Sequence, residues 1–182
     1  HNPRSWQPAD QLDWARPVKL PAQSHGYKLR SVQILAGSLG PGMHHRDLLV
    51  SRQHRMLVSS YISQRIFGVR DVLIPSIKLV VLSGIFIELD LTQVDYIHLL
   101  FDRHKIIYAE RAPNESLYTG PEALKSISPS ARRGILTIFQ NLATDTVRTS
   151  AEAHIPYGKL RKKLIARHHK NNKALLGINA HR

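Results

Sequence analysis

The sequence contains no cysteine, which excludes disulfide bonds, thiolate metal sites and a cysteine nucleophile within its 182 residues. It also lacks a long apolar run. The most apolar stretch, residues 79–87, is far shorter than the roughly 20 residues that a membrane-spanning helix needs. The first residues are polar and rich in proline, unlike a signal peptide. These absences predict one globular domain with an appendage and no membrane span, and they leave the compartment open.

Acidic residues are half as frequent as basic ones, with 13 Asp and Glu against 26 Lys and Arg, and the net charge is +13. The imbalance is concentrated after Glu152, where the side chains include no carboxylate and the cations are Lys159, Arg161, Lys162, Lys163, Arg167, Lys170, Lys173 and Arg182. Such a tail favours an anionic partner such as nucleic acid, bound by Lys159, Arg161, Lys162, Lys163 and Arg167. The alternative is a solvated basic helix that binds nothing in particular.

Hydrophobic periodicity predicts a β-rich core over residues 29–118. Alternating apolar residues at 29–36 indicate a strand, and a loop rich in glycine and proline follows. The apolar stretches on either side of Ser51–His54 indicate one bent strand or two short ones. Residues 61–68 are expected to form a helical turn that Gly68 closes.

Two β-hairpins are also predicted within this core. Residues 78–89 contain two β-rich runs separated by Ser83-Gly84, and residues 94–110 contain two runs on either side of a polar step. Pro75 is expected to start or bulge the strand at 72–82.

The regions before and after the core are not expected to be β-rich. Residues 1–28 contain four prolines and indicate a linker or remnant segment, with a short helical turn near Gln11–Trp14. Residues 119–182 are expected to form a helical appendix with a basic tail. Its last helix is expected at about Tyr157–Lys170, with Leu160, Leu164 and Ile165 on one face.

Ser51 and His54 stand out because they interrupt the β pattern of LLVSRQHRMLV (48–58). An imidazole titrates near neutral pH and can transfer a proton, and a neighbouring hydroxyl can orient it. The alternative is a partly buried histidine whose hydrogen bonds are satisfied in a turn between strands.

Two longer stretches give this motif a context. RDLLVSRQHRMLV (46–58) and IHLLFDRHKIIYAERAPNESLYTGPEAL (97–124) resemble a bacterial group of Hint domains, the family shared by hedgehog autoprocessing domains and inteins. KLRKKLIARHHKNNKALLG (159–177) is similar to the C-terminal end of that group. The resemblance covers residues 29–177. It implies a mainly β, horseshoe- or disc-like Hint fold, incomplete at the N-terminus, with C-terminal α-helices.

The resemblance also implies self-processing chemistry. In Hint domains a nucleophile, usually cysteine, attacks the preceding carbonyl and converts a peptide bond into an ester or thioester. By resemblance, His54 takes the place of the histidine that protonates the departing amide nitrogen, and Ser51 takes the place usually held by threonine. The substrate would be the polypeptide that flanks the domain.

A second group of site residues follows from the later stretch. His104 matches a histidine of the family, and His98 lies at or close to the position of the intein aspartate. Asp102 either orients His104 or begins a turn. His98 and Asp102 would share one face of a strand, and from there they could approach His54 across the sheet.

Two departures from the family limit the expected activity. The cysteine nucleophile and its opening strand are absent, and residues 112–120 have no His-Asn pair, because Asn114 follows a proline. We therefore expect a Hint fragment that is inactive alone, and N-terminal cleavage rather than splicing in a complete form. A histidine metal site built on His44, His45, His54 and His98 is a weaker alternative, since their spacing matches no metal motif. No cofactor is expected.

Overall fold

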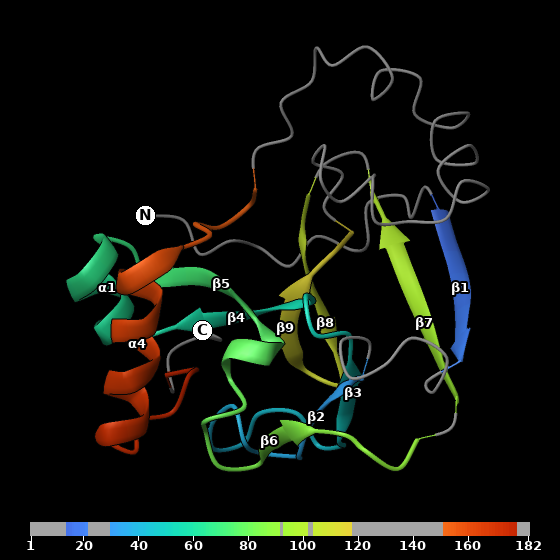
Figure 1. The fold of residues 1–182 in the computed structure, drawn as a ribbon. Coiled ribbons are helices and arrows are strands. Elements are labelled where there is room, and N and C mark those ends of the chain that lie inside the picture. The colour runs from blue at the N-terminus through green and yellow to red at the C-terminus, as the bar shows by residue number, and fades with distance from the viewer. Residues whose placement is uncertain (1–13, 22–29, 92, 102–103, 118–150, 178–182) are drawn as a thin grey trace.

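The computed structural model describes residues 14–21, 30–91, 93–101, 104–117 and 151–177 (Figure 1). For strand β1 and most of β7 it describes only the backbone. The described residues form nine strands, two α-helices and one 3-10 helix, so the fold is mainly β, as predicted. None of their helices combines the length and hydropathy that crossing a bilayer requires.

The strands form three antiparallel groups. The first group pairs β1 (Trp14–Pro21) with β7 (Gln93–Leu100). The second has β2 (Val32–Ile34) between β3 (Leu48–Val50) and β6 (Ile85–Ile87). The third is four-stranded, in the order β5 (Asp71–Pro75), β4 (Arg55–Ser59), β9 (Ala112–Glu115) and β8 (Ile106–Ala109).

Strand β1 differs from the sequence-based prediction. Residues Trp14–Pro21 pair along their whole length with β7, where the prolines indicated a linker. Proline lacks an N–H donor, and it is tolerated in a strand that has a partner on one side only. Within the described residues β1 has β7 alone as a neighbour. Residues 1–13, which include most of the predicted helical turn, lie outside the described part.

Both predicted hairpins are wrong. Residues 76–78 form the 3-10 helix η2 (Ser76–Lys78), and the chain then turns. Strand β6 pairs with β2, whose residues lie more than 50 positions earlier in the sequence. Strands β7 and β8 do follow each other in sequence, but β7 pairs with β1 and β8 with β9. The sequence pattern therefore identified most strand residues correctly, but the strand partners expected from it were wrong.

Helix α1 (Tyr61–Phe67) confirms the predicted helical turn. Ser60 caps it by accepting a hydrogen bond from the Ser63 N–H at 3.0 Å, and Gly68 ends it with a φ of 76°. A positive φ suits glycine, which has no Cβ to clash with the backbone. The helix connects the end of β4 to the start of β5.

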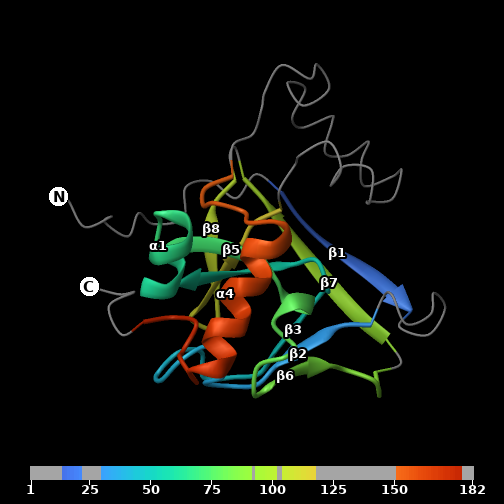
Figure 2. The same cartoon turned by 60° about the vertical axis from the view of Figure 1, so that its left-hand side comes forward.

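Helix α4 (Gly158–Lys170) lies beside α1 at one end of β4 and β5 (Figure 2). Leu164 and Ile165 are buried, as predicted, whereas Leu160 is 50 % exposed and does not belong to the buried face. The first part of the predicted helical appendix, residues 119–150, lies outside the described residues.

The segment after α4 completes the core. Leu175 and Leu176 are buried with residues of β2, β4 and β5 in one hydrophobic cluster. The Ser59 N–H donates to the Leu175 carbonyl at 2.9 Å, and the Leu176 N–H donates to the Leu39 carbonyl at 3.0 Å. The basic tail is therefore part of the packed domain, at least as far as residue 177.

The β8–β9 hairpin has a strained turn that yields a stability prediction. Glu110 and Arg111 have φ values of 49° and 70°, and both lie between the paired residues Ala109 and Ala112. A left-handed conformation costs a residue with a Cβ about 1–2 kcal/mol. We expect Arg111→Gly to raise the free energy of unfolding by about 1 kcal/mol.

Arg111→Ala is the matched control for this turn, because it keeps the strain and loses the same contact between Arg111 Nη1 and His45 Nε2, which is 2.9 Å long. Urea unfolding of the two variants measures the difference. A glycine variant no more stable than the alanine variant would contradict the prediction.

Candidate active site

A β-turn presents His54 between two sheets. The His54 N–H donates to the Ser51 carbonyl at 3.0 Å, which closes the four-residue turn between β3 and β4. The buried Ser76 holds this turn from outside: its hydroxyl donates to the Ser51 carbonyl at 2.8 Å, and its N–H donates to the His54 carbonyl at 2.9 Å. The two apolar stretches around the motif are therefore separate strands in different sheets, one of the two predicted alternatives.

Asn114 fixes the protonation pattern of the His54 ring. Its side-chain amide donates from Nδ2 to the Ala112 carbonyl at 2.8 Å, so the other amide atom, Oδ1, is the acceptor that faces His54. His54 Nε2 lies 3.0 Å from this oxygen and must carry the hydrogen. In the neutral ring Nδ1 is then the basic nitrogen, and no described residue is hydrogen-bonded to it.

Beside this pair Glu115 forms the charged centre of the site. Its carboxylate accepts hydrogen bonds from the Arg55 backbone N–H at 2.8 Å and from Arg55 Nη1 at 2.7 Å. Burial raises the pKa of Glu115, but His104 and Arg55 more than offset this effect, so the pKa lies below its ordinary value. The carboxylate is therefore ionised at neutral pH, and its negative charge favours the protonated form of His54.

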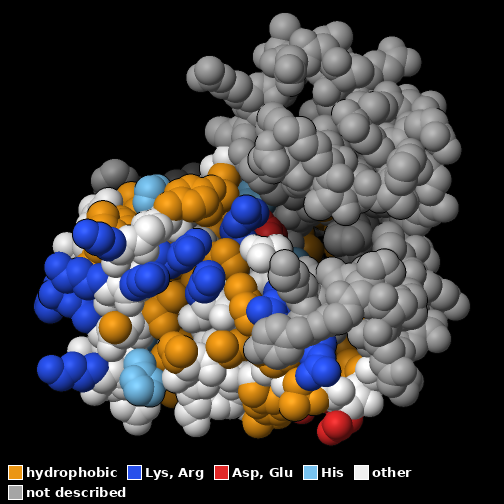
Figure 3. All heavy atoms as spheres, in the orientation of Figure 1, with side chains coloured by type: hydrophobic (Ala, Val, Ile, Leu, Met, Phe, Trp, Pro, Cys, Tyr) orange, Lys and Arg blue, Asp and Glu red, His pale blue; other side chains and the backbone are white. Residues whose placement is uncertain are grey.

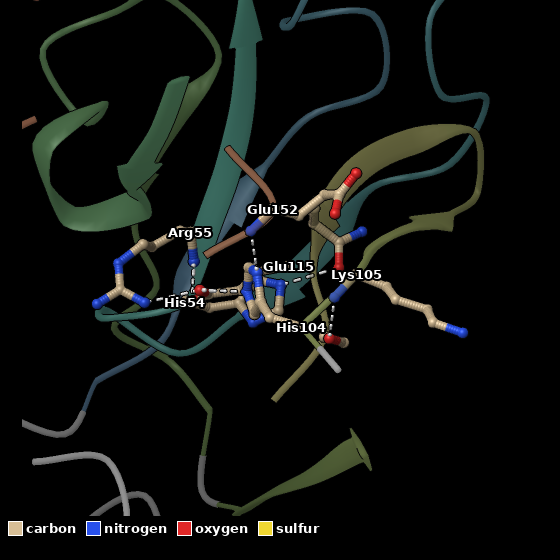
Figure 4. A network of polar contacts seen from close by, with 8 residues as sticks. His54, Arg55, His104, Lys105, Glu115 and Glu152 are labelled. Carbon is tan, nitrogen blue, oxygen red and sulfur yellow. Dashed lines mark hydrogen bonds and ion pairs between the residues drawn. The ribbon is translucent and has the colours of Figure 1, made fainter. Parts of the chain in front are cut away.

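The buried His104 joins Glu115 to the C-terminal part of the chain (Figure 4). Its Nδ1 accepts the Glu152 backbone N–H at 3.0 Å, so the neutral ring carries its hydrogen on Nε2. That atom lies 3.5 Å from Glu115 Oε2. Both nitrogens of His104 thus face partners within the chain, whereas Nδ1 of His54 has no hydrogen-bond partner among the described residues.

The electrostatics make His54 a proton acceptor at neutral pH. Burial lowers its pKa below the ordinary value of 6.5, and the Glu115 carboxylate and the Asn114 hydrogen bond offset part of this effect. A neutral imidazole with one basic nitrogen can take a proton from a nucleophile and pass it to a leaving group. The arrangement therefore suits acyl transfer.

The sequence of the chain matches a known protein family. A sequence model described as Hint domain matches residues 7–121, which is more than half of the 182 residues. The chain belongs to the Hint domain family. No curated protein and no solved structure matches it significantly. Because it belongs to this family, the chain is related, in general, to autoproteolytic and splicing domains.

The predicted site residues of this Hint domain are placed as follows. Glu115 contacts His104 and acts electrostatically on His54, which is hydrogen-bonded to Asn114, so both histidines belong to one network. Ser51 contributes its carbonyl to the turn, and no described residue is hydrogen-bonded to its hydroxyl. The backbone of His98 lies in β7 opposite Arg16, but its side chain is outside the described part, and so is all of Asp102. Their expected approach to His54 stays a prediction.

Sequence reasoning missed Asn114 and Glu115, which hold the two histidines. Both are buried in β9, an inner strand of the four-stranded sheet, although APNES has the composition of a polar loop. Their partners His54 and Arg55 are 60 residues away in sequence, so the local pattern gives no sign of the contact. Ser76 was missed for the same reason.

The described residues contain no group of three or more His, Asp or Glu side chains placed to hold a metal ion. His44 is buried, and His45 instead contacts Arg111 in the β8–β9 turn. The described side chains of His44, His45 and His54 therefore do not form one metal site.

Two buried imidazoles predict a loss of stability in mild acid. Burial lowers the pKa of both His54 and His168, so the unfolded chain binds protons more readily than the folded one. Their contribution to stability is complete above pH 6.5 and is lost as the pH falls from there through the folded-state pKa values. In this window each histidine lowers the free energy of unfolding by at most about 1.4 kcal/mol for each unit by which the pH falls.

Urea unfolding at pH 7.5, 6.5 and 5.5 measures this dependence. His168→Gln should make the decline shallower, whereas the same substitution at the exposed neighbour His169 should leave it unchanged. A decline with the same slope in both variants would show that His168 does not contribute.

Proposed function

We propose that this Hint domain carries the proton-transfer half of an N-to-S acyl shift on a flanking polypeptide. The observation that supports it best is the single protonation pattern of His54, in which Asn114 holds the hydrogen on Nε2 and leaves Nδ1 basic. Membership of the Hint family supplies the reaction type.

In the proposed reaction, His54 Nδ1 first takes the proton from a cysteine thiol. The thiolate sulfur forms a bond to the carbonyl carbon of the preceding peptide, and the C–N bond breaks. The protonated imidazole returns its proton to the departing nitrogen, which leaves as an amine and not as a poor amide anion. No proton is gained or lost overall, and the product is a thioester.

We propose that the nucleophile must be supplied, because the 182 residues contain no cysteine. These residues alone are then inactive. We also propose that the reaction ends with attack on the thioester by an external nucleophile and does not continue to splicing. The support for this comes from the resemblance: residues 112–120 correspond to the stretch where inteins have their terminal His-Asn pair, and they contain no such pair.

A complementation experiment tests the proposal. The full chain is mixed with a synthetic peptide that carries a fluorescent N-terminal flank, a cysteine and the opening strands of a Hint domain, and then dithiothreitol is added. Mass spectrometry should detect the flank as its thiol adduct. Fluorescence anisotropy of the same peptide measures assembly independently of cleavage.

A peptide with alanine in place of the cysteine is the control. It should assemble with the same affinity and release no flank. If the cysteine peptide assembles with the chain but no thiol adduct forms, the proposal is wrong. If the peptide does not assemble, the same test is made with the two segments joined in one polypeptide.

A further inference from the structure

Helix α4 presents a continuous cationic face to solvent. Leu164, Ile165 and His168 mark its buried side. The cations on the exposed side are Lys159, Lys162, Lys163, Arg167 and Lys170. In Figure 3 the Lys and Arg side chains gather on the side of the molecule where α1 and α4 lie.

The stability of the helix does not explain the cations in its first half. The last turn carries Arg167 and Lys170, which interact favourably with the negative end of the helix dipole. Lys159 lies in the first turn, at the positive end, where a cation is unfavourable and where no acidic residue is present. Lys162 and Lys163 lie in the second turn, where the dipole does not favour a cation.

Like-charge repulsion adds to this cost. Lys159 and Lys163 are four residues apart, as are Lys163 and Arg167, so each pair lies on one side of the helix and repels. Lys159, Lys163 and Arg167 form no ion pair with a carboxylate of the described residues. A bound anion would relieve both the repulsion and the unfavourable dipole interaction.

The rest of the fold holds this face in place. His168 Nδ1 donates to the Lys173 carbonyl at 3.0 Å, and its Nε2 accepts from the Ser60 hydroxyl at 3.0 Å. These contacts join α4 to the cap of α1 and to the segment that completes the core. The cations are therefore displayed on a fixed helix and not on a loose tail.

We propose that the exposed face of α4 binds the phosphate backbone of duplex nucleic acid. Lys159 and Lys170 are separated by about 16 Å along the axis, which corresponds to about five base pairs of duplex. Single strands are usually held by stacked aromatic rings, and Tyr157 is the one exposed aromatic residue on α4 and its cap. A membrane-surface helix buries its apolar face in lipid, but here that face is packed against the protein. This binding does not depend on the proposed acyl shift.

The test uses the full chain and a mixed-sequence 20-base-pair DNA duplex, with affinity measured by fluorescence anisotropy at several salt concentrations. Five phosphate contacts predict a slope of log K against log salt of up to about −4.5. In the double variant K159Q/K163Q the slope should be smaller by about 2, and affinity at 0.1 M salt should fall on the order of 50-fold.

The matched control has the same net charge. R46Q/K78Q removes two exposed cations from the loop before β3 and from η2, and it should weaken binding by less than about threefold. The K159Q/K163Q variant should unfold at the same urea concentration as the unchanged chain or a higher one, because it removes repulsion from the helix. When the measured midpoint is unchanged or higher, a loss of binding is not caused by a loss of folding.

Three outcomes would overturn the proposal. One is an equal loss of affinity in both double variants, which would show that binding follows net charge alone. Another is tighter binding to a single-stranded 20-mer than to the duplex. The third is tighter binding to phosphatidylserine vesicles, with the loss on substitution confined to those vesicles.

Discussion

Replacing His54 with alanine is expected to lower the rate of thiol-induced cleavage in the complemented protein by about 10²- to 10⁴-fold. This is the usual contribution of a positioned general acid or base. Of the two described histidines in the site, His54 has a ring nitrogen to which no described residue is hydrogen-bonded. The measurement is the single-turnover rate of flank release, with assembly followed by anisotropy.

The pH dependence of this rate distinguishes proton transfer from a structural role. The proposed reaction begins with neutral His54, whose pKa lies below 6.5, so the rate should rise with pH below that value and then level off with respect to this group. His169→Ala, which changes an exposed histidine of α4, should leave the rate and profile unchanged. A His54→Ala variant that assembles and cleaves at the original rate would exclude the proposed role.

The second large effect concerns the buried ion pair in β4 and β9. Arg55→Met is expected to lower the free energy of unfolding by about 3–5 kcal/mol, because it leaves the Glu115 carboxylate buried without its main counter-charge. Glu115 is 8 % exposed and Arg55 is 22 % exposed, so water compensates little of the loss. Urea unfolding at pH 7 measures the change.

A second substitution tests the cause. Adding Glu115→Gln to Arg55→Met should recover part of the stability, because the amide removes the buried charge and its oxygen can still accept the Arg55 backbone N–H. The exposed pair Arg46–Glu110, 3.8 Å apart, is the natural comparison. Arg46→Met should cost less than about 1 kcal/mol. No recovery in the double variant would show that lost packing, and not the unpaired charge, causes the effect.

Local patterns were sufficient for elements whose ends are marked by their own residues. Ser60 and Gly68 define α1 through a side-chain cap and a positive φ, and both features depend only on neighbouring residues. The apolar spacing of α4 identified Leu164 and Ile165 as core. Pairing between strands depends on distant segments, and Ser83-Gly84 was read as a hairpin because nothing nearby shows that β6 pairs with β2.

The residues of the candidate site also fall into those that the sequence revealed and those that it did not. His54 and His104 were found through resemblance to a family, since an imidazole between strands is otherwise ambiguous. Asn114 and Glu115, which set the hydrogen position and the charge, were not found. A buried carboxylate is identified by its partners, and those of Glu115 come from another strand and from the loop before β8.

The backbone bonds of Ser59 to the segment at Leu175 and Gly177 have a consequence for biosynthesis. At about 5–20 residues per second, translation from residue 59 to residue 176 takes roughly 6–23 s. During that time the end of β4 lacks the strand-like segment that covers it in the finished molecule. A nascent chain is therefore open to aggregation or chaperone capture until translation has passed its last leucines, and a premature stop codon shortly before them would remove part of the core.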